Sequence, residues 1–250
     1  MNRTLSWINP DDPLPPTQLA LTPDEGANGL LAAGADLSSG RLQEAYRRGI
    51  FPWFSKGEPV LWWTPDPRMV LKIADFKISK SFSKTLRRAL NDPELEIRCD
   101  QDFEGVMRAC AEARPGQSGT WISDRMIQCY CDLHAQGLAH CVTVHRGERL
   151  LGGLYCVAIG KMVFGESMFS RAPDGSKLAL ASLVGWLLSQ GGLMIDCQQK
   201  TEHLASLGAQ EIRRQEFEFI VQDLTSRDTL AWSTTPVSKM DLSRLTHVAP

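Results

Sequence analysis

Residues 141–169 read CVTVHRGERLLGGLYCVAIGKMVFGESMF. Apolar residues recur with a period of two in three runs, which are Cys141–Arg146, Arg149–Ile159 and Met162–Phe169. Two glycine-containing dipeptides, at 147–148 and 160–161, separate these runs and are typical of tight turns. The pattern predicts a three-stranded antiparallel meander.

The chain after the meander changes to helical spacing. From Asp174 or Ser176, leucines recur every three or four residues as far as Leu188, and Gly191 ends the pattern. The segments beyond it predict a buried strand over 193–197, a short helix near 203–207, a strand near 210–213 and a helix over 217–224. We find no pattern beyond residue 225.

The chain before the meander predicts further helices. Apolar stripes place one over 103–110 and one over 127–134, a serine at 79 or 81 starts another, and Asp36–Ser39 starts a fourth that Gly49 ends. Proline and tryptophan fill residues 51–68 and exclude a helix there. Residues 1–28 hold five of the 14 prolines and predict an irregular arm.

Taken together, these patterns predict an α+β protein with a boundary near residue 70. We expect residues 1–70 to form a small N-terminal α/β domain with a Pro-rich arm and Trp-rich loops, 71–230 to form a larger C-terminal domain, and 231–250 to form a tail.

Composition narrows the class of protein. The chain has 250 residues, 43% of them hydrophobic and 22% charged, with a net charge of −2, which excludes a disordered chain. No apolar run reaches the roughly 20 residues that span a bilayer. Seven scattered cysteines, an odd number, indicate a reducing compartment. We therefore expect a cytoplasmic protein with no membrane partner.

A basic run stands out in this acidic chain. Its members are Lys77, Lys80, Lys84, Arg87 and Arg88, and the last three share one helical face. Such a run is often only a solvated helix face. The alternative is a contact with nucleic-acid phosphates.

Two strands carry residues that could form a site. Alternation places Glu166 between Phe164 and Met168 on one face, which is typical either of an edge strand in solvent or of an apolar pocket with one charged group. Asp196 and Gln198 share a face where the next strand ends, so they either close a turn or line a cleft.

Metal and nucleotide sites are not predicted. Cys129 and Cys131 point about 200° apart on a helix, and His134 lies on its apolar stripe. Cys197 with His203 is a weak candidate for a thiol nucleophile, because Cys197 faces away from Asp196. The chain has no glycine-rich phosphate loop. We expect no metal and no cofactor.

Several segments resemble the leucyl/phenylalanyl-tRNA–protein transferase family. They are GIFPWF at 49–54, WWTPDPR at 62–68, GTWIS at 119–123, LLGGLY at 150–155, FGESMFS at 164–170, IDCQ at 195–198 and HLASLGA at 203–209. The resemblance implies transfer of Leu or Phe from tRNA to proteins beginning with Lys or Arg, which marks them for bacterial N-end-rule degradation. It also implies a C-terminal domain with the Gcn5-related N-acetyltransferase fold.

The resemblance further implies roles for individual residues. Asp196, Gln198 and Glu166 would be catalytic, Glu166 and Asp196 would meet the positive acceptor N-terminus, and Gln198 would be hydrogen-bonded to Asp196. Four aromatic residues would bind the terminal adenosine of tRNA: Trp53, Trp121, Tyr46 and Tyr130. The Leu or Phe side chain would lie among Leu154, Phe164, Met168, Leu180, Leu187 and Ile195. The basic run at 77–88 would hold tRNA phosphates.

Two rival functions are an acetyl-CoA-dependent acetyltransferase and an RNA-binding module without catalysis. The first lacks its expected pyrophosphate loop, and the second leaves Asp196, Gln198 and Glu166 unexplained. We expect a monomer, because no apolar stripe is left over.

Overall fold

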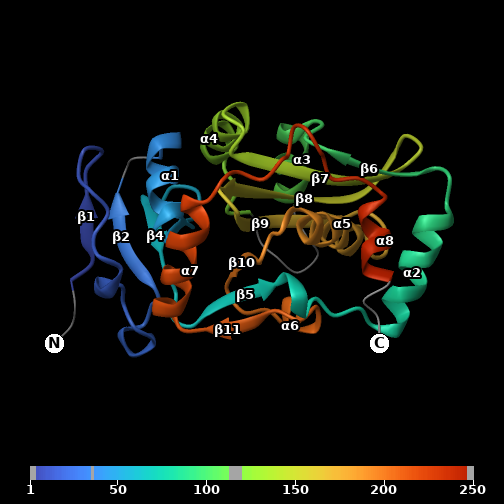
Figure 1. Ribbon diagram of the computed structural model, residues 1–250. Helices are drawn as coiled ribbons and strands as arrows, with labels where there is room; N and C mark the ends of the chain where they lie inside the picture. The colour runs from blue at the N-terminus through green and yellow to red at the C-terminus, as the bar shows by residue number, and fades with distance from the viewer. Residues whose placement is uncertain (1–3, 35–36, 113–119, 247–250) are drawn as a thin grey trace.

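Two β-sheets organise the chain in the computed structural model, which describes residues 4–34, 37–112 and 120–246 (Figure 1). Asp36, from the expected helix start, and Gly119, from the GTWIS segment, lie outside the described residues. The smaller sheet has the order β1-β2-β4-β3, with β1 (Ser6–Ile8), β2 (Leu30–Gly34), β3 (Phe51–Pro52) and β4 (Val60–Trp63). The larger has the order β11-β5-β10-β9-β8-β7-β6, with β5 (Arg68–Lys72), β6 (Leu95–Cys99), β7 (Ala139–Arg146), β8 (Arg149–Ile159), β9 (Met162–Ser170), β10 (Met194–Gln198) and β11 (Gln210–Ile212).

The helices are α1 (Ser39–Arg47), α2 (Lys80–Asn91), α3 (Phe103–Ala111), α4 (Asp124–Ala135), α5 (Gly175–Gln190), α6 (Glu202–Ser206), α7 (Arg214–Ser226) and α8 (Asp241–Thr246). Short 3-10 turns occur at Thr17–Leu19, Pro23–Glu25 and Ile73–Asp75. Serine side chains cap three helices as expected, with Ser38, Ser79 and Ser123 accepting from backbone N–H groups of the first turn. Over the described ranges, no helix is long and apolar enough to cross a bilayer.

The predicted meander is confirmed, and it forms the centre of the larger sheet. β7, β8 and β9 pair antiparallel in sequence order, β6 adds to β7, and β10 lies parallel to β9. Glu166 therefore belongs to a central strand, which excludes the edge-strand interpretation. The overall class, a mixed α and β protein with a smaller N-terminal sheet, is also as expected.

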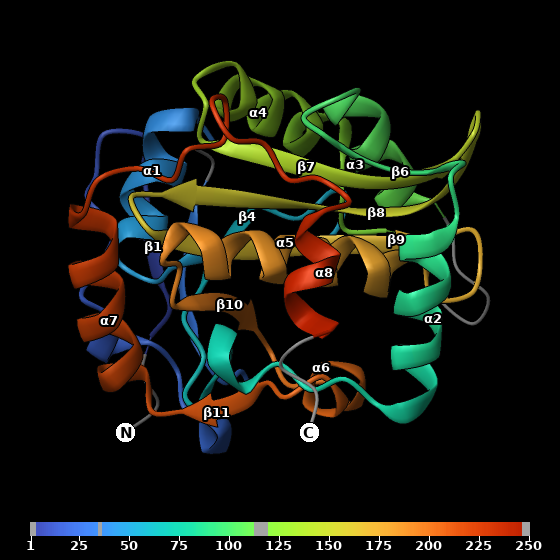
Figure 2. The ribbon, with the colours of Figure 1, turned by 45° about the vertical axis from the view of Figure 1, so that its right-hand side comes forward.

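Helices cover both faces of the larger sheet (Figure 2). α5 lies across one face and is itself covered by α8, with α2 beside it. α3 and α4 cover the other face, where α1 and α7 connect the smaller sheet to the larger one. The core on this second face contains residues from both halves of the chain, among them Tyr46, Phe164 and Phe217.

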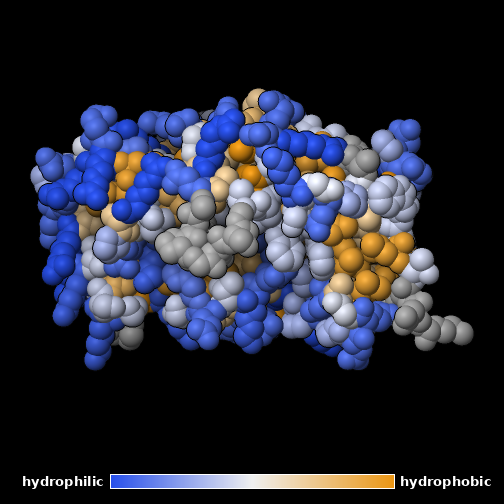
Figure 3. All heavy atoms as spheres, turned by 180° about the vertical axis from the view of Figure 1, so that it is seen from behind, coloured by the Kyte–Doolittle hydropathy of each residue, from blue (hydrophilic) through white to orange (hydrophobic). Residues whose placement is uncertain are grey.

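Two segments are more ordered than their sequence suggests. In the tail, α8 packs on α5, and the Trp232 ring stacks on His140, with 4.0 Å between centroids, and packs at a tilt against Trp186, with 4.3 Å between centroids. In the N-terminal arm, β1 pairs with β2. Seen from behind, the surface is mostly hydrophilic, and its largest hydrophobic area lies over the smaller sheet (Figure 3).

Candidate active site

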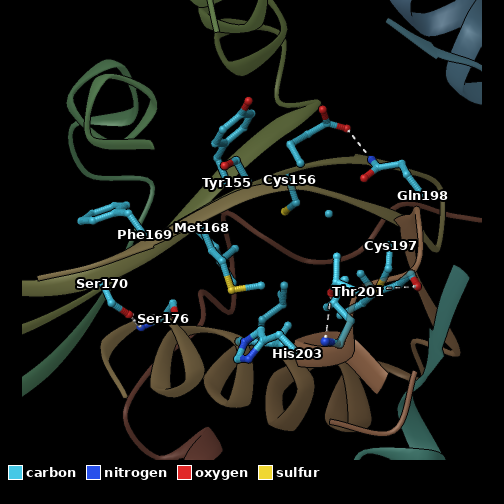
Figure 4. A pocket seen from close by; sticks show the side chains of 18 of the residues that line it. Tyr155, Cys156, Met168, Phe169, Ser170, Ser176, Cys197, Gln198, Thr201 and His203 are labelled. Carbon is cyan, nitrogen blue, oxygen red and sulfur yellow. Dashed lines mark hydrogen bonds between the residues drawn. The ribbon is translucent and has the colours of Figure 1, made fainter. Parts of the chain in front are cut away.

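A cavity of about 730 Å³ opens between β9 and β10 of the larger sheet. The two strands run parallel but pair at only two positions, Val163 with Ile195 and Phe164 with Asp196. The remainder of β9 therefore lines the cavity, together with the end of β10, α5 and α6 (Figure 4). The site lies where two neighbouring strands stop pairing.

A β-bulge in β9 determines which side chains face this cavity. Across the β8–β9 pair, Tyr155 is opposite Ser167 and Cys156 is opposite Gly165, so Glu166 is the extra residue. An extra residue exchanges the two faces of the strand beyond it.

This bulge corrects one expectation from the sequence. Phe164 packs against the Tyr46 ring, with 4.9 Å between centroids, and does not line the cavity. Met168, beyond the bulge, points into the cavity from the opposite face of the sheet (Figure 4). The prediction that Phe164 and Met168 share a face is wrong, because strict alternation requires an unbroken ladder.

The apolar wall of the cavity contains most of the expected residues. Leu154, Met168, Leu180 and Ile195 line it, but Leu187 does not. Leu187 follows Leu180 by two helical turns, and its side chain is fully buried in the core beside the sheet.

Sequence reasoning also missed part of the wall. Cys156, Phe169, Leu183 and Leu204 line the cavity as well. Leu183 follows Leu180 by one helical turn, and Cys156 follows Leu154 by one strand period, so spacing alone could have found both.

Glu166 lies at the cavity and is held by two tyrosines. The Tyr46 hydroxyl donates to Oε1 at 2.8 Å, the Tyr130 hydroxyl donates to Oε2 at 3.1 Å, and the two hydroxyl oxygens are 2.5 Å apart. Both tyrosines are fully buried and do not line the cavity, so the expected contact of their rings with adenosine is not possible here. They orient the carboxyl group instead.

The pKa of Glu166 is raised to about 8. Burial is the main cause, and it outweighs the tyrosine hydrogen bonds, which favour the ionised form. The number of protons available to the hydrogen bonds around Glu166 also indicates that its carboxyl group is protonated. Three oxygen–oxygen contacts close a ring of Glu166, Tyr46 and Tyr130, and each needs one proton, but the two tyrosines supply only two. A protonated Glu166 supplies the third, and one tyrosine then accepts from the carboxyl group and donates to the other tyrosine.

Asp196 forms a buried ion pair with Arg68. Arg68 Nε donates to Oδ1 at 2.8 Å and Nη2 donates to Oδ2 at 2.7 Å, and both side chains are fully buried. The guanidinium also lies over the rings of Phe51 and Phe217, at 4.7 and 4.5 Å from their centroids. The structure thus corrects the expected contact between Asp196 and an acceptor amine, because both carboxylate oxygens already bind Arg68.

Gln198 is placed by a second bulge, at the end of β10. Its φ of 56° is in the left-handed region, and its backbone N–H donates to Asp196 Oδ1 at 3.0 Å. The side-chain Nε2 donates to Glu166 Oε1 at 3.2 Å (Figure 4). Gln198 is hydrogen-bonded to Asp196 as expected, but through its backbone. Because of the bulge, Cys197 also lines the cavity, which alternation did not predict.

The remaining candidates lie at the surface. Trp53 is 40% exposed, and Trp63 supports it by donating from Nε1 to its carbonyl oxygen at 2.7 Å. Trp121 is half-buried just before α4. All five basic residues of the run are exposed on or beside α2, and none forms an ion pair within the described part of the chain: Lys77, Lys80, Lys84, Arg87 and Arg88.

Comparison with known proteins gives the following similarities. Residues 70–222 match the family described as leucyl/phenylalanyl-tRNA protein transferase, and residues 35–66 match the N-terminal domain of the same family. A relative of that name from Burkholderia ambifaria (strain MC40-6) is 56% identical over 90% of this chain and 89% of its own length. Another, from Paraburkholderia xenovorans (strain LB400), is 55% identical over 90% and 93%.

Similar solved structures are more distant. FemX is 11% identical, with a TM-score of 0.43, over 80% of this chain and 76% of that chain. A GCN5-related N-acetyltransferase-like protein from Streptococcus suis 89/1591 is 14% identical, with a TM-score of 0.29, over 80% and 74%.

Proposed function

Because the chain belongs to the leucyl/phenylalanyl-tRNA–protein transferase family, and is therefore an aminoacyltransferase, we propose that the cavity between β9 and β10 is its active site. The amine of an acceptor protein attacks the ester carbonyl of Leu-tRNA or Phe-tRNA. A C–N bond forms, the C–O bond to ribose breaks, and a proton moves from the amine to the ribose oxygen. The acceptor begins with Lys or Arg, and the product enters N-end-rule degradation in the cytoplasm.

The observation that carries this proposal is the carboxyl of Glu166, which lies at the cavity beside its apolar wall. Its pKa of about 8 is close to the 7.7–8.0 typical of an N-terminal amine, so a proton passes between the two groups at little cost. Glu166 accepts the proton of the attacking amine, and Tyr46 and Tyr130 hold it in place.

Gln198 orients the amine, and Asp196 positions Gln198. The Gln198 amide nitrogen already binds Glu166, while its amide oxygen accepts no hydrogen bond from the described residues and can accept one from the amine. Asp196 acts through the backbone of Gln198, because its carboxylate is fully buried and paired with Arg68. Holding amine and ester together in this geometry supplies most of the acceleration, because the ester is already activated.

The Leu or Phe side chain lies against the apolar wall. Leu154, Met168, Leu180, Leu183 and Ile195 provide aliphatic and thioether surface, which fits an uncharged side chain. Such a wall discriminates between side chains by about 1–3 kcal/mol per methylene.

The tRNA binds on the surface around the cavity. Trp53 and Trp121 stack on the terminal adenosine, which is worth roughly 1–3 kcal/mol per base. The exposed cationic face of α2 contacts acceptor-stem phosphates. We also place a domain boundary at residue 70, supported by the two family matches, which end at 66 and begin at 70.

The basic face of α2 gives a first prediction. In the triple variant Lys84→Ala, Arg87→Ala, Arg88→Ala, the KM for aminoacyl-tRNA rises at least tenfold at physiological salt, while kcat is unchanged, since these side chains lie outside the cavity. The dependence of log KM on log salt becomes shallower by about 0.7–0.9 for each phosphate that the variant no longer binds. The exposed residues Lys200, in the loop after β10, and Arg227, directly after α7, provide a control double alanine variant that keeps the parent KM.

The function itself is tested by transfer of radiolabelled Leu or Phe from charged tRNA. The acceptor is a protein with N-terminal Arg, and the control is the same protein with N-terminal Gly. Label on the Arg protein alone is the expected result. Bound tRNA without any transfer would indicate an RNA-binding module instead.

A further inference from the structure

Of the three residues that β8 contributes to the cavity wall, Leu154, Tyr155 and Cys156, Cys156 has the smallest side chain. On the ladder of β8 and β9, Leu154 is opposite Met168, and Cys156 lies two residues further along β8, opposite Gly165, which has no side chain. Figure 4 shows Cys156 and Met168 extending from the sheet into the cavity. The cavity therefore extends deepest toward the sheet at Cys156, beside the bulge in β9.

The Cys156 thiol has no other evident role in the described part of the chain. Cys156 lines the cavity but is otherwise enclosed by its neighbours and fully buried, and its Sγ has no hydrogen-bond partner among the described residues. Burial raises the pKa of the thiol well above its usual value, so Cys156 stays neutral and behaves as a small apolar group.

The residues around Cys156 are closely packed and cannot move to compensate for a change in the size of its side chain. Backbone of the neighbouring strand closes the cavity at Gly165, where a Cβ would lie 3.3 Å from the Asp196 carbonyl oxygen. Leu183, on the facing helix α5, is 1% exposed and packed in the core. A change in volume at Cys156 is therefore transmitted to whatever occupies the cavity.

We propose that Cys156 sets the depth of the side-chain cavity and thereby the preference between Phe and Leu as the transferred residue. The inference rests on the proposed function of this cavity. A phenyl ring is longer than an isobutyl group, so it needs the space beside Cys156 more than Leu does. Enlarging this space favours Phe, and filling it favours Leu.

The test is a competition between Leu-tRNA and Phe-tRNA in one reaction, because the ratio of products does not depend on how much of a variant is folded. In Cys156→Ala the Phe:Leu product ratio rises about tenfold, and in Cys156→Val it falls about tenfold, as expected for one methylene-sized change in a pocket. Opposite shifts from the two variants distinguish a size effect from general damage.

Cys141 provides the matched control. It is an equally buried cysteine on the adjacent strand β7, belongs to the core on the other face of the sheet and does not line the cavity. Cys141→Ala and Cys141→Val keep the parent ratio. Ratios that stay constant at Cys156, or that move in the same direction in both variants, would overturn the inference. Absence of transfer by the parent enzyme would instead refute the proposed function.

Discussion

Replacing Glu166 with Gln lowers kcat by about 10²–10⁴-fold, the usual contribution of a positioned general base. Gln is almost the same size as Glu and can keep hydrogen bonds to Tyr46 and Tyr130, but it cannot accept a proton from the amine. Single-turnover transfer from preloaded aminoacyl-tRNA measures this loss without interference from product release.

The pH dependence distinguishes a base from a binding group. The free enzyme must carry ionised Glu166 and the acceptor must carry a neutral amine, so log(kcat/KM) rises with a slope of about 2 below pH 7. In Glu166→Gln only the amine titrates, and the slope falls to about 1. An unchanged slope with only a few-fold loss of kcat would remove Glu166 from proton transfer.

The pH dependence of the free energy of unfolding distinguishes a catalytic role of Glu166 from a structural one. Between 4.5, the ordinary pKa, and about 8, the folded chain keeps a proton on Glu166 that the unfolded chain has lost. Its free energy of unfolding therefore falls as the pH rises through that interval. Glu166→Gln lacks this proton and loses this part of the slope, so above pH 8 it is at least as stable as the parent in urea. Glu96→Gln, on the edge strand β6, serves as a control with unchanged kcat.

Much of the fold could be predicted because its signals are local. The period of two in residues 141–169 and the leucine spacing of α5 arise from burial of one face, and serine caps fix where three helices start. α8 and the stacking of Trp232 on His140 were not predicted, because they depend on contacts between segments far apart in the chain.

The contrast between local signals and long-range contacts also explains which parts of the candidate site could be predicted. Glu166 and Gln198 could be identified as candidates because each is a polar residue in an apolar strand, Glu166 in the middle of one and Gln198 at the end of another. Their neighbours could not, because two bulges change the faces of β9 and β10, and periodicity alone does not reveal a bulge. Arg68 was missed because its partner Asp196 is 128 residues away in the chain.

The buried pair of Arg68 and Asp196 gives the second large effect. Arg68→Met leaves the Asp196 carboxylate buried without a cation, and the free energy of unfolding falls by about 3–5 kcal/mol. Urea denaturation followed by fluorescence measures this loss. The exposed pair of Asp223, in the last turn of α7, and Arg227, directly after it, is the control, where Arg227→Met costs less than about 1 kcal/mol.

A double variant then separates stability from catalysis. Arg68→Met with Asp196→Leu replaces the ion pair by apolar side chains, which typically restores the stability that the single change removes. It also removes the oxygen that accepts the Gln198 backbone N–H, so Gln198 is no longer held in its left-handed conformation. We expect a folded protein whose kcat stays at least tenfold below the parent, while the KM for aminoacyl-tRNA is unchanged. If stability and kcat recover together, Asp196 contributes only to folding and Gln198 does not depend on it for its position.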